Sequence, residues 1–331
     1  MKALVYTDVK TLKYKDVQNP KLKKNEKIIK VEAAGICGSD MHAYKGLDSI
    51  RKSPPLILGH EIVGINLSSN KHVVINPIIT CKKCKQCITK NENLCTNLSM
   101  IGLSKPVKRH GGFADYLAIP NTNILNISSE KNLYHAALTE PTAVSLRAVN
   151  LAILHSKTKI YNSNILIIGA GAIGLLIAII LQNKGVKKIT IIDTNENRLK
   201  ECRKYSSANV FYPDSLKIKD YNYDLVFDAV GLNVTRKKSL ESIREGGVII
   251  HVGLSSRDGG IDFLSITRKE IILLGSFCYT SKEFSKSLSM ISKKELGSLL
   301  WLDFCPLKDG ARVFKEIDKG KIIAPKTILI P

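Results

Sequence analysis

The densest group of possible metal ligands in this 331-residue chain is a run of four cysteines, Cys81, Cys84, Cys87 and Cys95, within fifteen residues. Four thiolates suit a closed, tetrahedral structural zinc site. The other four of the eight cysteines are dispersed, and no export signal is visible in the sequence. The cluster therefore indicates metal binding rather than a disulfide framework.

A second set of possible ligands is spread out: Cys37, the pair His60-Glu61, and Glu140. A thiolate, an imidazole and a carboxylate form a mixed set that can leave one coordination position open, which distinguishes a catalytic zinc from a structural one. A single cysteine or histidine is more often a core residue. The combination predicts a catalytic zinc, with either Glu61 or Glu140 as the carboxylate.

A glycine-rich turn runs from an apolar strand into a helical stretch, with Gly169, Gly171 and Gly174 in the spacing G-x-G-x-x-G. The first glycine permits the tight turn, the second lets the backbone approach a pyrophosphate, and the third allows close helix–strand packing. A glycine turn without a ligand is the alternative. Because the turn opens a strand–helix–strand unit, the pattern predicts a dinucleotide site.

Asp193 ends the next strand, nineteen residues after Gly174. A carboxylate there accepts hydrogen bonds from the adenosine ribose and repels a 2′-phosphate, so the sequence favours NAD over NADP. Arg198 lies five residues later, where it could stack on the adenine or face solvent.

Two different patterns of elements surround these residues. Up to about residue 145 the chain has short β patterns punctuated by Gly and Pro, typical of an all-β, barrel-like module. After a helical stretch over Thr142–Leu154, buried strands and helices alternate, which predicts an α/β, doubly wound parallel sheet. The strands expected in the first part are Lys27–Val31, Ile62–Leu67, His72–Ile75 and Phe113–Ile119. Those expected in the second part are Ile165–Ile168, Ile189–Ile192, Val210–Tyr212, Leu225–Phe227, Val248–Val252 and Ile271–Leu274. The helices expected between them are Ile173–Asn183, Asn195–Tyr205 and Val234–Arg244, and a last helix and strand follow from about Ser281 and near Lys326–Ile330.

Composition limits the class of protein. The apolar fraction of 44% and the charged fraction of 24% are ordinary for a globular chain, and no apolar run is long enough to span a membrane, so we expect a cytoplasmic protein with no membrane partner. The net charge of +21 could indicate a zinc-stabilised nucleic-acid binder. The lysines are scattered in short groups, however, and that reading leaves the dinucleotide motif unexplained, so we expect no nucleic-acid partner.

Taken together, the motifs resemble those of the zinc-containing medium-chain alcohol dehydrogenases, over nearly the whole chain. Glu140-Pro141 and His42-Ala-Tyr44 are most similar to the polyol branch of sorbitol, galactitol-phosphate and threonine dehydrogenases. The resemblance implies a GroES-like β-barrel catalytic domain of residues 1–145 and 281–331, and a Rossmann NAD-binding domain of residues 146–280. The matching segments are Gly35–His42, Gly59–Gly64, the four-cysteine cluster, Gly111–Tyr116, Glu140-Pro141 and Gly169–Gly174.

The resemblance also implies a role for individual side chains. Cys37, His60 and Glu61 would bind the catalytic zinc, and Glu140 would lie beside it as a ligand or through a water. Ser39 would bind the substrate oxygen and accept its proton. The other implied site residues are His42 as the outward proton relay, Tyr44 in the substrate pocket, and Ile173, Asp193, Arg198, Val252, Gly253, Leu254 and Phe277 as NAD contacts.

Three departures from the family pattern matter. The stretch from Gly64 to Cys81 is short, which predicts a tight turn between two strands at Ser68–Lys71. Cys278, followed by Tyr279, stands where sorbitol dehydrogenases carry a polyol-binding arginine, so both are candidate substrate residues and sorbitol itself is disfavoured. The run Lys108–His110 could reach an anionic substrate group or form a solvated loop.

These observations predict an enzyme that oxidises a small polyol or secondary alcohol, with or without a phosphate, to a ketone. The cofactors would be NAD and two Zn²⁺ ions, one catalytic and one structural. A threonine-type amino-alcohol dehydrogenase and a carbonyl reductase are the alternatives, and the polyol relatives suggest a homo-oligomer, a tetramer or dimer.

Overall fold

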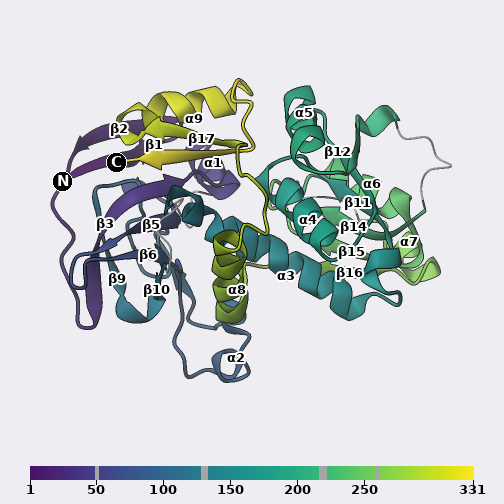
Figure 1. Ribbon diagram of the computed structural model, residues 1–331, viewed down its shortest axis with the longest axis horizontal. Helices are drawn as coiled ribbons and strands as arrows, with labels where there is room; N and C mark the ends of the chain where they lie inside the picture. The colour runs from purple at the N-terminus through teal and green to yellow at the C-terminus, as the bar shows by residue number, and fades with distance from the viewer. Residues whose placement is uncertain (49–51, 128–132, 216–221, 258, 260) are drawn as a thin grey trace. The chain divides into compact units, whose positions relative to one another are not determined.

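The computed structural model describes residues 1–48, 52–127, 133–215, 222–257, 259 and 261–331. The chain divides into two compact units, each described here by itself (Figure 1). Unit 1 comprises Met1–Glu140, Thr280–Lys294 and Ser298–Pro331, and unit 2 comprises Pro141–Tyr279 and Glu295–Gly297. Within the described residues, no helix has the length and apolar character needed to cross a membrane.

Unit 1 is built mainly from antiparallel strands. Its largest sheet has the order β10-β6-β5-β3-β18-β17, with β9 also paired to β3, and a smaller sheet has the order β2-β1-β4. The strands are β1 (Lys2–Asp8), β2 (Thr11–Asp16), β3 (Glu26–Gly35), β4 (Leu56–Ile57), β5 (Glu61–Asn66), β6 (Lys71–Ile75), β7 (Ile78–Ile79), β8 (Ser99–Met100), β9 (Tyr116–Pro120), β10 (Ile124–Asn126), β17 (Leu302–Pro306) and β18 (Lys326–Ile330). The helices are α1 (Gly38–Tyr44), α2 (Lys85–Ile88), α8 (Ser281–Ser292) and α9 (Gly310–Asp318), with 3-10 turns η1 (Glu92–Leu94), η2 (Asn121–Asn123), η3 (Leu133–Leu138) and η7 (Leu307–Asp309).

The expected tight turn in the shortened segment is confirmed. β5 and β6 pair antiparallel from Ile62↔Ile75 to Asn66↔Lys71, so only four residues connect them. The amides of Ser69 and Asn70 both donate to the carbonyl of Asn66, at 3.1 and 2.8 Å. Asn70 has φ of 52°, a left-handed conformation that asparagine tolerates well.

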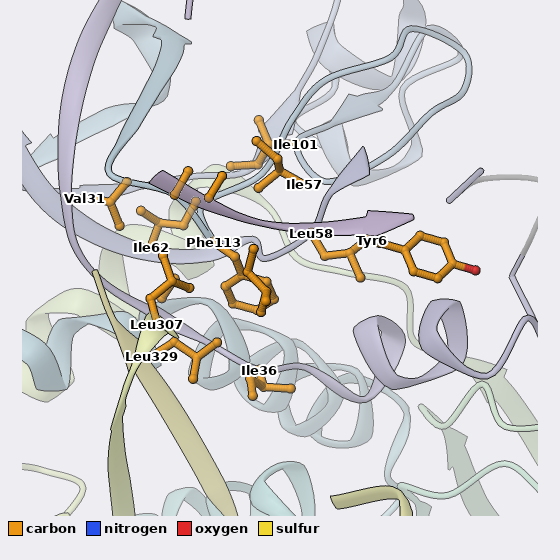
Figure 2. Close-up of a cluster of buried hydrophobic side chains, with 14 of the residues drawn as sticks. Tyr6, Val31, Ile36, Ile57, Leu58, Ile62, Ile101, Phe113, Leu307 and Leu329 are labelled. Atoms are coloured by element: carbon orange, nitrogen blue, oxygen red, sulfur yellow. The ribbon is translucent and has the colours of Figure 1, made fainter. Parts of the chain in front are cut away.

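The core of unit 1 lies between its sheets and α9, and it is drawn in part in Figure 2. Phe113 and Leu58 are fully buried at its centre, and the Phe113 ring meets Phe314 of α9 edge-on at 5.9 Å. Each such side chain contributes about 1.5–3 kcal/mol by leaving water. This packing fixes Leu58, two residues before His60, and so it holds one of the predicted ligands on a rigid base.

Unit 2 contains a six-stranded parallel sheet in the order β13-β12-β11-β14-β15-β16. Numbered within the unit, this is the order 3-2-1-4-5-6 of dinucleotide-binding folds, which confirms the predicted doubly wound sheet. The strands are β11 (Asn164–Ile168), β12 (Lys188–Ile192), β13 (Asn209–Phe211), β14 (Tyr223–Asp228), β15 (Ile243–His251) and β16 (Ile272–Gly275). The helices are α3 (Thr139–His155), which begins at the end of unit 1, α4 (Ala172–Asn183), α5 (Glu196–Tyr205), α6 (Asn233–Ser242) and α7 (Phe263–Arg268), with 3-10 turns η4 (Ile160–Asn162) and η5 (Pro213–Ser215).

One boundary in unit 2 differs from the sequence expectation. The helix expected over Val234–Arg244 ends at Ser242, and β15 begins at Ile243 instead of Val248. Ile243 pairs with Tyr223 ahead of an irregularity in the register, and Gly246 bends the chain with φ of 66°. Tertiary pairing with β14 therefore overrides the local helical pattern.

Candidate active site and metal centres

The predicted catalytic ligands Cys37, His60 and Glu61 come together in unit 1, where one ligand atom from each lies within 4.8 Å of the others. Cys37 precedes α1, and its amide donates to the Asp40 carboxylate at 3.1 Å, which fixes the thiol at the start of the helix. Glu61 is the first residue of β5 and follows His60 directly. The end of one strand and the start of another thus place three ligands at one point.

The Glu61 carboxylate gives a direct test of whether a cation fits this group. Its Oε1 accepts a hydrogen bond from Lys326 Nζ at 2.6 Å. Its Oε2 is buried and has no hydrogen-bond partner among the described residues. An unsatisfied buried carboxylate oxygen is costly, and beside a thiol and an imidazole it is what a divalent metal would satisfy. The residues therefore fit a zinc ion with mixed ligands.

The Asp40 carboxylate lies next to the imidazole of His60. Its buried Oδ1 lies 3.6 Å from His60 Nδ1 and 2.9 Å from Lys52 Nζ. Burial alone would raise the pKa of the Asp40 carboxyl, but the charges of Lys52 and His60 hold it well below its usual range. A carboxylate behind a histidine orients the ring and strengthens it as a metal ligand.

Burial and neighbouring charges also act in opposite directions on the pKa of His60. Burial would lower the pKa of its imidazole, but Asp40 and then Cys37 outweigh burial and raise this pKa well above the ordinary value. The negative surroundings therefore favour positive charge at this point, whether carried by a proton or by a metal ion.

Lys326 is a participant that sequence reasoning missed. Its ammonium is buried, and it donates to Glu61 Oε1 and to the carbonyl of Ile36 at 2.8 Å. Burial would lower the pKa of Lys326, but Glu61 and Cys37 outweigh it and raise the pKa. Lys326 lies 265 residues from Glu61 in the chain, so no local spacing could have signalled the pair.

Glu140 lies in the first turn of α3 and is 5% exposed. It is not a member of the tight three-residue group, but its charge helps to raise the pKa of Lys326, so it lies near the same cluster. Of the two candidate carboxylates, Glu61 is the one within 4.8 Å of the other two ligand atoms.

The proposed relay residues lie on one face of α1, three residues apart. Ser39 Oγ accepts a hydrogen bond from Lys52 Nζ at 3.2 Å, and His42 is half-buried. Tyr44, expected in the substrate pocket, is 5% exposed and packs on Phe314 at 5.6 Å between ring centroids. The structure thus places Tyr44 in the core of unit 1.

The four cysteines of the second group form a compact lobe at α2. Neighbouring sulfurs lie 3.5 Å apart for Cys95 and Cys81, 3.6 Å for Cys84 and Cys87, 3.9 Å for Cys84 and Cys95, and 4.0 Å for Cys81 and Cys87. A tetrahedral Zn–S distance of about 2.3 Å requires sulfur–sulfur edges of about 3.8 Å, and a disulfide requires about 2.05 Å. The four sulfur–sulfur distances are therefore close to those of a zinc tetrahedron, and none of the four thiols is in a disulfide.

Backbone amides in the lobe favour thiolates. The amide of Cys84 points at Cys81 Sγ at 3.4 Å, and the amide of Cys81 points at Cys95 Sγ at 3.4 Å. Hydrogen bonds from the backbone of Cys87 and Thr96 lower the pKa of Cys84 to about 5. The backbone therefore favours a metal-binding thiolate at Cys84, whereas burial raises the pKa of Cys87 to about 12.

The glycine turn in unit 2 has the conformation that its sequence predicts. Gly169 has φ of 106°, and a Cβ on Gly174 would overlap the carbonyl of Gly169. Gly171 precedes α4, and a Cβ built on it would meet nothing within 4 Å, so the start of the helix is open to a ligand. An open helix start after a glycine turn is the geometry that a pyrophosphate requires.

Asp193 lies against this turn. Its Oδ2 accepts from the amide of Ala170 at 2.7 Å, and its Oδ1 accepts from the amide of Asn195 at 2.8 Å. Each oxygen retains a lone pair, so the carboxylate can still accept from a ribose hydroxyl. Arg198 is half-buried in the first turn of α5.

The other predicted cofactor and substrate residues lie on unit 2 with different exposures. Val252 and Gly253 are buried after β15, while Leu254 and Phe277 are 59% and 40% exposed. Ile173, in α4, is half-buried. Cys278 is half-buried with φ of 48°, and Tyr279 is 1% exposed.

The run Lys108–His110 is partly solvated, since Lys108 and His110 are exposed while Arg109 is half-buried. Arg109 Nη1 pairs with Glu26 Oε1 at 2.9 Å, and both side chains are largely buried. His110 Nδ1 accepts from the amide of Ile57 at 3.2 Å. These contacts engage both side chains within unit 1.

Family models match both halves of the chain. The alcohol dehydrogenase GroES-like domain matches residues 23–129, and the zinc-binding dehydrogenase domain matches residues 172–293. L-galactonate-5-dehydrogenase of Escherichia coli (strain K12) is 30% identical over 306 residues, which cover 86% of each chain. This chain belongs to the zinc-type, medium-chain alcohol dehydrogenases.

Solved structures of other alcohol dehydrogenases share the fold of this zinc-type alcohol dehydrogenase. L-idonate 5-dehydrogenase from Escherichia coli K-12 has a TM-score of 0.88 and 26% identity, with 100% of this chain and 98% of that chain covered. Acetophenone reductase from Geotrichum candidum, solved in complex with NAD, has a TM-score of 0.88 and 25% identity, with coverages of 100% and 97%. The predicted GroES-like and Rossmann folds and the place in the polyol branch are confirmed.

Sequence reasoning also missed two residues in this dehydrogenase besides Lys326. Asp40 stands inside the segment Gly35–His42, and the rule that ligating histidines have a carboxylate behind them could have found it. Lys52 carried no signal, because a lone lysine in a lysine-rich chain has no distinguishing spacing.

Proposed function

We propose that this dehydrogenase oxidises a small polyol or secondary alcohol to a ketone, with zinc at Cys37, His60 and Glu61 and with NAD as hydride acceptor. The observation that carries the proposal is the group of three ligand atoms within 4.8 Å, with Glu61 Oε2 buried and unsatisfied. The relatives named for L-galactonate and L-idonate support a polyhydroxylated substrate.

Each group of the chain has a defined part in this reaction. Cys37, His60 and Glu61 would hold a zinc ion, which would supply Lewis-acid polarisation of the alcohol, and NAD would supply the hydride acceptor. Ser39 accepts the alcohol proton and His42 passes it outward. Lys52 has donors but no acceptor, so its contact with Ser39 leaves the hydroxyl proton of Ser39 free to point elsewhere.

Lys326 and Asp40 set the charge around the ligands. Lys326 holds one oxygen of Glu61, so the other oxygen faces the metal position. Asp40 holds His60 at Nδ1 and Cys37 at its amide, so one carboxylate orients two ligands. Such support raises the precision with which a metal site is held.

We further propose that residues 1–145 and 281–331 act as the catalytic domain and residues 146–280 as the NAD-binding domain. The carboxylate of Asp193 beside the glycine turn supports NAD over NADP. The enzyme assembles as a homo-oligomer, a dimer or tetramer, which light scattering of the purified protein measures directly.

The decisive experiment is a screen of NAD reduction over polyols, sugar acids, sugar phosphates, amino alcohols and simple secondary alcohols, with metal analysis of the same sample. We expect about two zinc ions per chain, because each of the two ligand groups holds one. Turnover should be highest on a polyol or sugar acid. Turnover on no alcohol in the presence of both zinc ions and NAD would contradict the proposed activity.

A further inference from the structure

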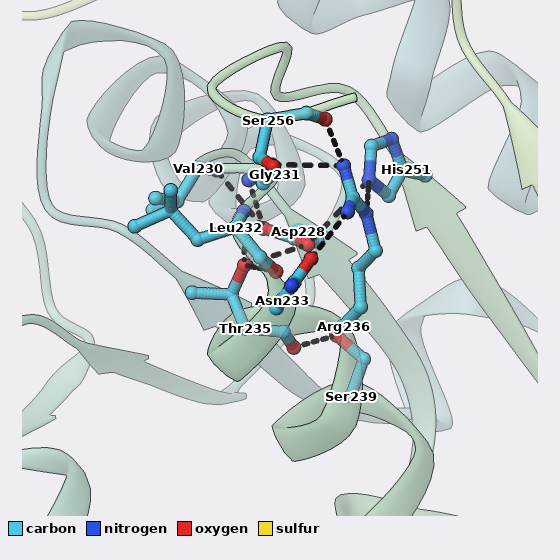
Figure 3. Close-up of polar contacts among 10 residues, drawn as sticks. All are labelled: Asp228, Val230, Gly231, Leu232, Asn233, Thr235, Arg236, Ser239, His251 and Ser256. Carbon is cyan, nitrogen blue, oxygen red and sulfur yellow. Dashed lines mark hydrogen bonds and ion pairs between the residues drawn. The ribbon is translucent and has the colours of Figure 1, made fainter. Parts of the chain in front are cut away.

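A single guanidinium joins the two loops that follow the carboxyl ends of β14 and β15 in the parallel sheet of unit 2 (Figure 3). Arg236, in α6, donates through Nη2 to the carbonyl of Gly231 at 3.0 Å and to the carbonyl of Ser256. It also donates through Nε to His251 Nε2 at 3.0 Å and through Nη1 to Asn233 Oδ1 at 3.1 Å. Gly231 belongs to the loop after β14, and Ser256 belongs to the loop after β15.

The two loops also contact each other through the backbone. The amide of Ser256 donates to the carbonyl of Gly231 at 3.0 Å, and the amide of Ser255 donates to that of Val230 at 3.3 Å. Gly231 has φ of 78°, and a Cβ on it would overlap the carbonyl of Gly253. The carbonyl of Gly231 thus accepts from both the amide of Ser256 and Arg236, which uses both of its lone pairs.

Asp228 anchors this arrangement at the end of β14. Its fully buried Oδ1 accepts from the amides of Val230 and Gly231 at 3.0 and 2.8 Å, and its Oδ2 accepts from Thr235 Oγ1 at 3.0 Å. Its Oδ2 also lies 3.8 Å from His251 Nε2. The carboxylate orders the first loop, and the guanidinium ties the second loop to it.

Both loops follow the carboxyl ends of their strands, β14 and β15. In doubly wound sheets, ligands bind outside the carboxyl ends of the strands. The second loop starts with Val252, Gly253 and Leu254, the segment expected to contact NAD, and Leu254 is 59% exposed. The amides of Val252 and Gly253 both donate to the carbonyl of Asp228 at 2.9 Å, so the network fixes the start of this loop.

We propose that Arg236 is a positioning residue for the cofactor: it holds the loop over Val252–Ser256 in its binding conformation before NAD arrives. This inference rests on the proposed function, because it assumes that NAD binds at the carboxyl ends of these strands. Ordering the loop in advance removes an entropic cost that binding would otherwise carry.

An arginine is required at this position for a geometric reason. The four acceptors lie around a planar fork that presents five N–H donors in fixed directions. A lysine ammonium carries the same charge at one point, and it cannot reach acceptors on both loops and His251 together. The Arg236→Lys variant therefore separates the effect of charge from that of geometry.

His251 offers a spectroscopic signature of the intact bridge. Because Nε2 accepts from Arg236, the imidazole is neutral with its proton on Nδ1. Burial lowers the pKa of His251, Asp228 raises it, and Arg236 lowers it further. Loss of the guanidinium should therefore raise this pKa and change the tautomer.

The test measures the dissociation constant for NADH by fluorescence in the full chain, for wild type, Arg236→Ala, Arg236→Lys and Lys237→Ala. Lys237 is the matched control, since it is the adjacent lysine, with a side chain 78% exposed and paired only loosely with Glu241. We expect Arg236→Ala to weaken NADH binding about 10- to 100-fold, the range for losing hydrogen bonds to a charged group. Arg236→Lys should recover only part of this loss, and Lys237→Ala should bind as wild type.

Two further readouts separate positioning from simple stability. Guanidinium at low millimolar concentration should restore NADH binding to Arg236→Ala but not change wild type. The nitrogen resonances of His251 in labelled protein, assigned with a His251→Gln variant, should shift toward the other tautomer in Arg236→Ala. If Arg236→Ala fails to fold, Arg236→Lys gives the same comparison.

The outcomes are distinct. NADH binding by Arg236→Ala within twofold of Lys237→Ala would overturn the inference and leave the proposed function intact. Weakened binding that matches the loss of folded protein, with no rescue by guanidinium, would also overturn it. No NADH binding by the wild type would instead remove the NAD part of the proposed function.

Discussion

The two metal-ligand groups of this dehydrogenase are built in opposite ways. The cysteine lobe takes all four ligands from fifteen consecutive residues, and all four sulfurs lie within 4.8 Å of one another. The catalytic group takes Cys37 from the start of α1 and His60-Glu61 from the start of β5, and it is completed by Lys326 from β18. A local site depends on loop geometry alone, while a dispersed site exists only when the barrel has folded.

The largest effect we expect is on activity, from Cys37→Ala. Removing one ligand from an open site should release the catalytic zinc and lower kcat/KM about 10³-fold or more, because Lewis-acid stabilisation is worth several kcal/mol. Metal analysis should show one zinc ion lost and one retained. Cys305→Ala is the control, a half-buried thiol outside both groups. Activity near that of wild type in Cys37→Ala would exclude zinc at this group.

The next effect is on stability, from Cys84→Ser in the lobe. Loss of a structural metal should lower the free energy of unfolding by about 3 kcal/mol, a fall in Tm of about 6–12 °C. Calorimetry measures the transition, and metal analysis should again show one zinc ion lost. Because the lobe is separate in sequence from the catalytic ligands, residual activity at low temperature should persist. An unchanged Tm would show that the lobe holds no structural metal.

A smaller effect on activity is expected from Asp40→Asn. The amide keeps the size of the side chain but loses the charge that faces His60 and Lys52, so zinc affinity and activity should each fall about 10- to 100-fold. Competition with a zinc chelator measures the affinity for the catalytic ion. Asp303→Asn serves as the control for an acid outside the site, since Asp303 is near Cys305 on β17. Equal zinc release from both variants would contradict the supporting role of Asp40.

The smallest effect concerns how α1 is held. Asp318, at the end of α9, pairs with Lys45 at 2.8 Å and Lys10 at 3.3 Å. Lys45 and then Lys10 hold the pKa of Asp318 below its ordinary value. The ion pair therefore stabilises the fold above the unfolded pKa of about 3.9 and is lost as the pH falls through the folded pKa. Asp318→Asn should cost about 0.5 kcal/mol at pH 7, and this cost should shrink as the pH falls below about 3.9, measured by urea unfolding. A cost that grows on acidification would contradict this assignment.

Sequence patterns predicted the parallel sheet of unit 2 better than the details of its edges. Buried runs such as Ile165–Ile168 are apolar on both faces, and a strand covered on both faces leaves that signature in the sequence. The start of β15 at Ile243 was missed, because Ile243 and Arg244 were assigned to the end of the preceding helix. Only pairing with β14 decides that they form a strand.

Sequence alone determined the four-cysteine group, the glycine turn and the fold class, because those features depend on residue type at fixed local spacing. For the dispersed group it gave candidate ligands, and the fold brought Cys37, His60 and Glu61 together. Tertiary structure alone decided that Lys326 meets Glu61, that Asp40 and Lys52 share one buried charge pair, and that Arg236 ties two loops together. Those contacts join residues far apart in the chain or without a distinguishing pattern. Long side chains such as lysine and arginine reach many positions, so only packing and burial select their partners.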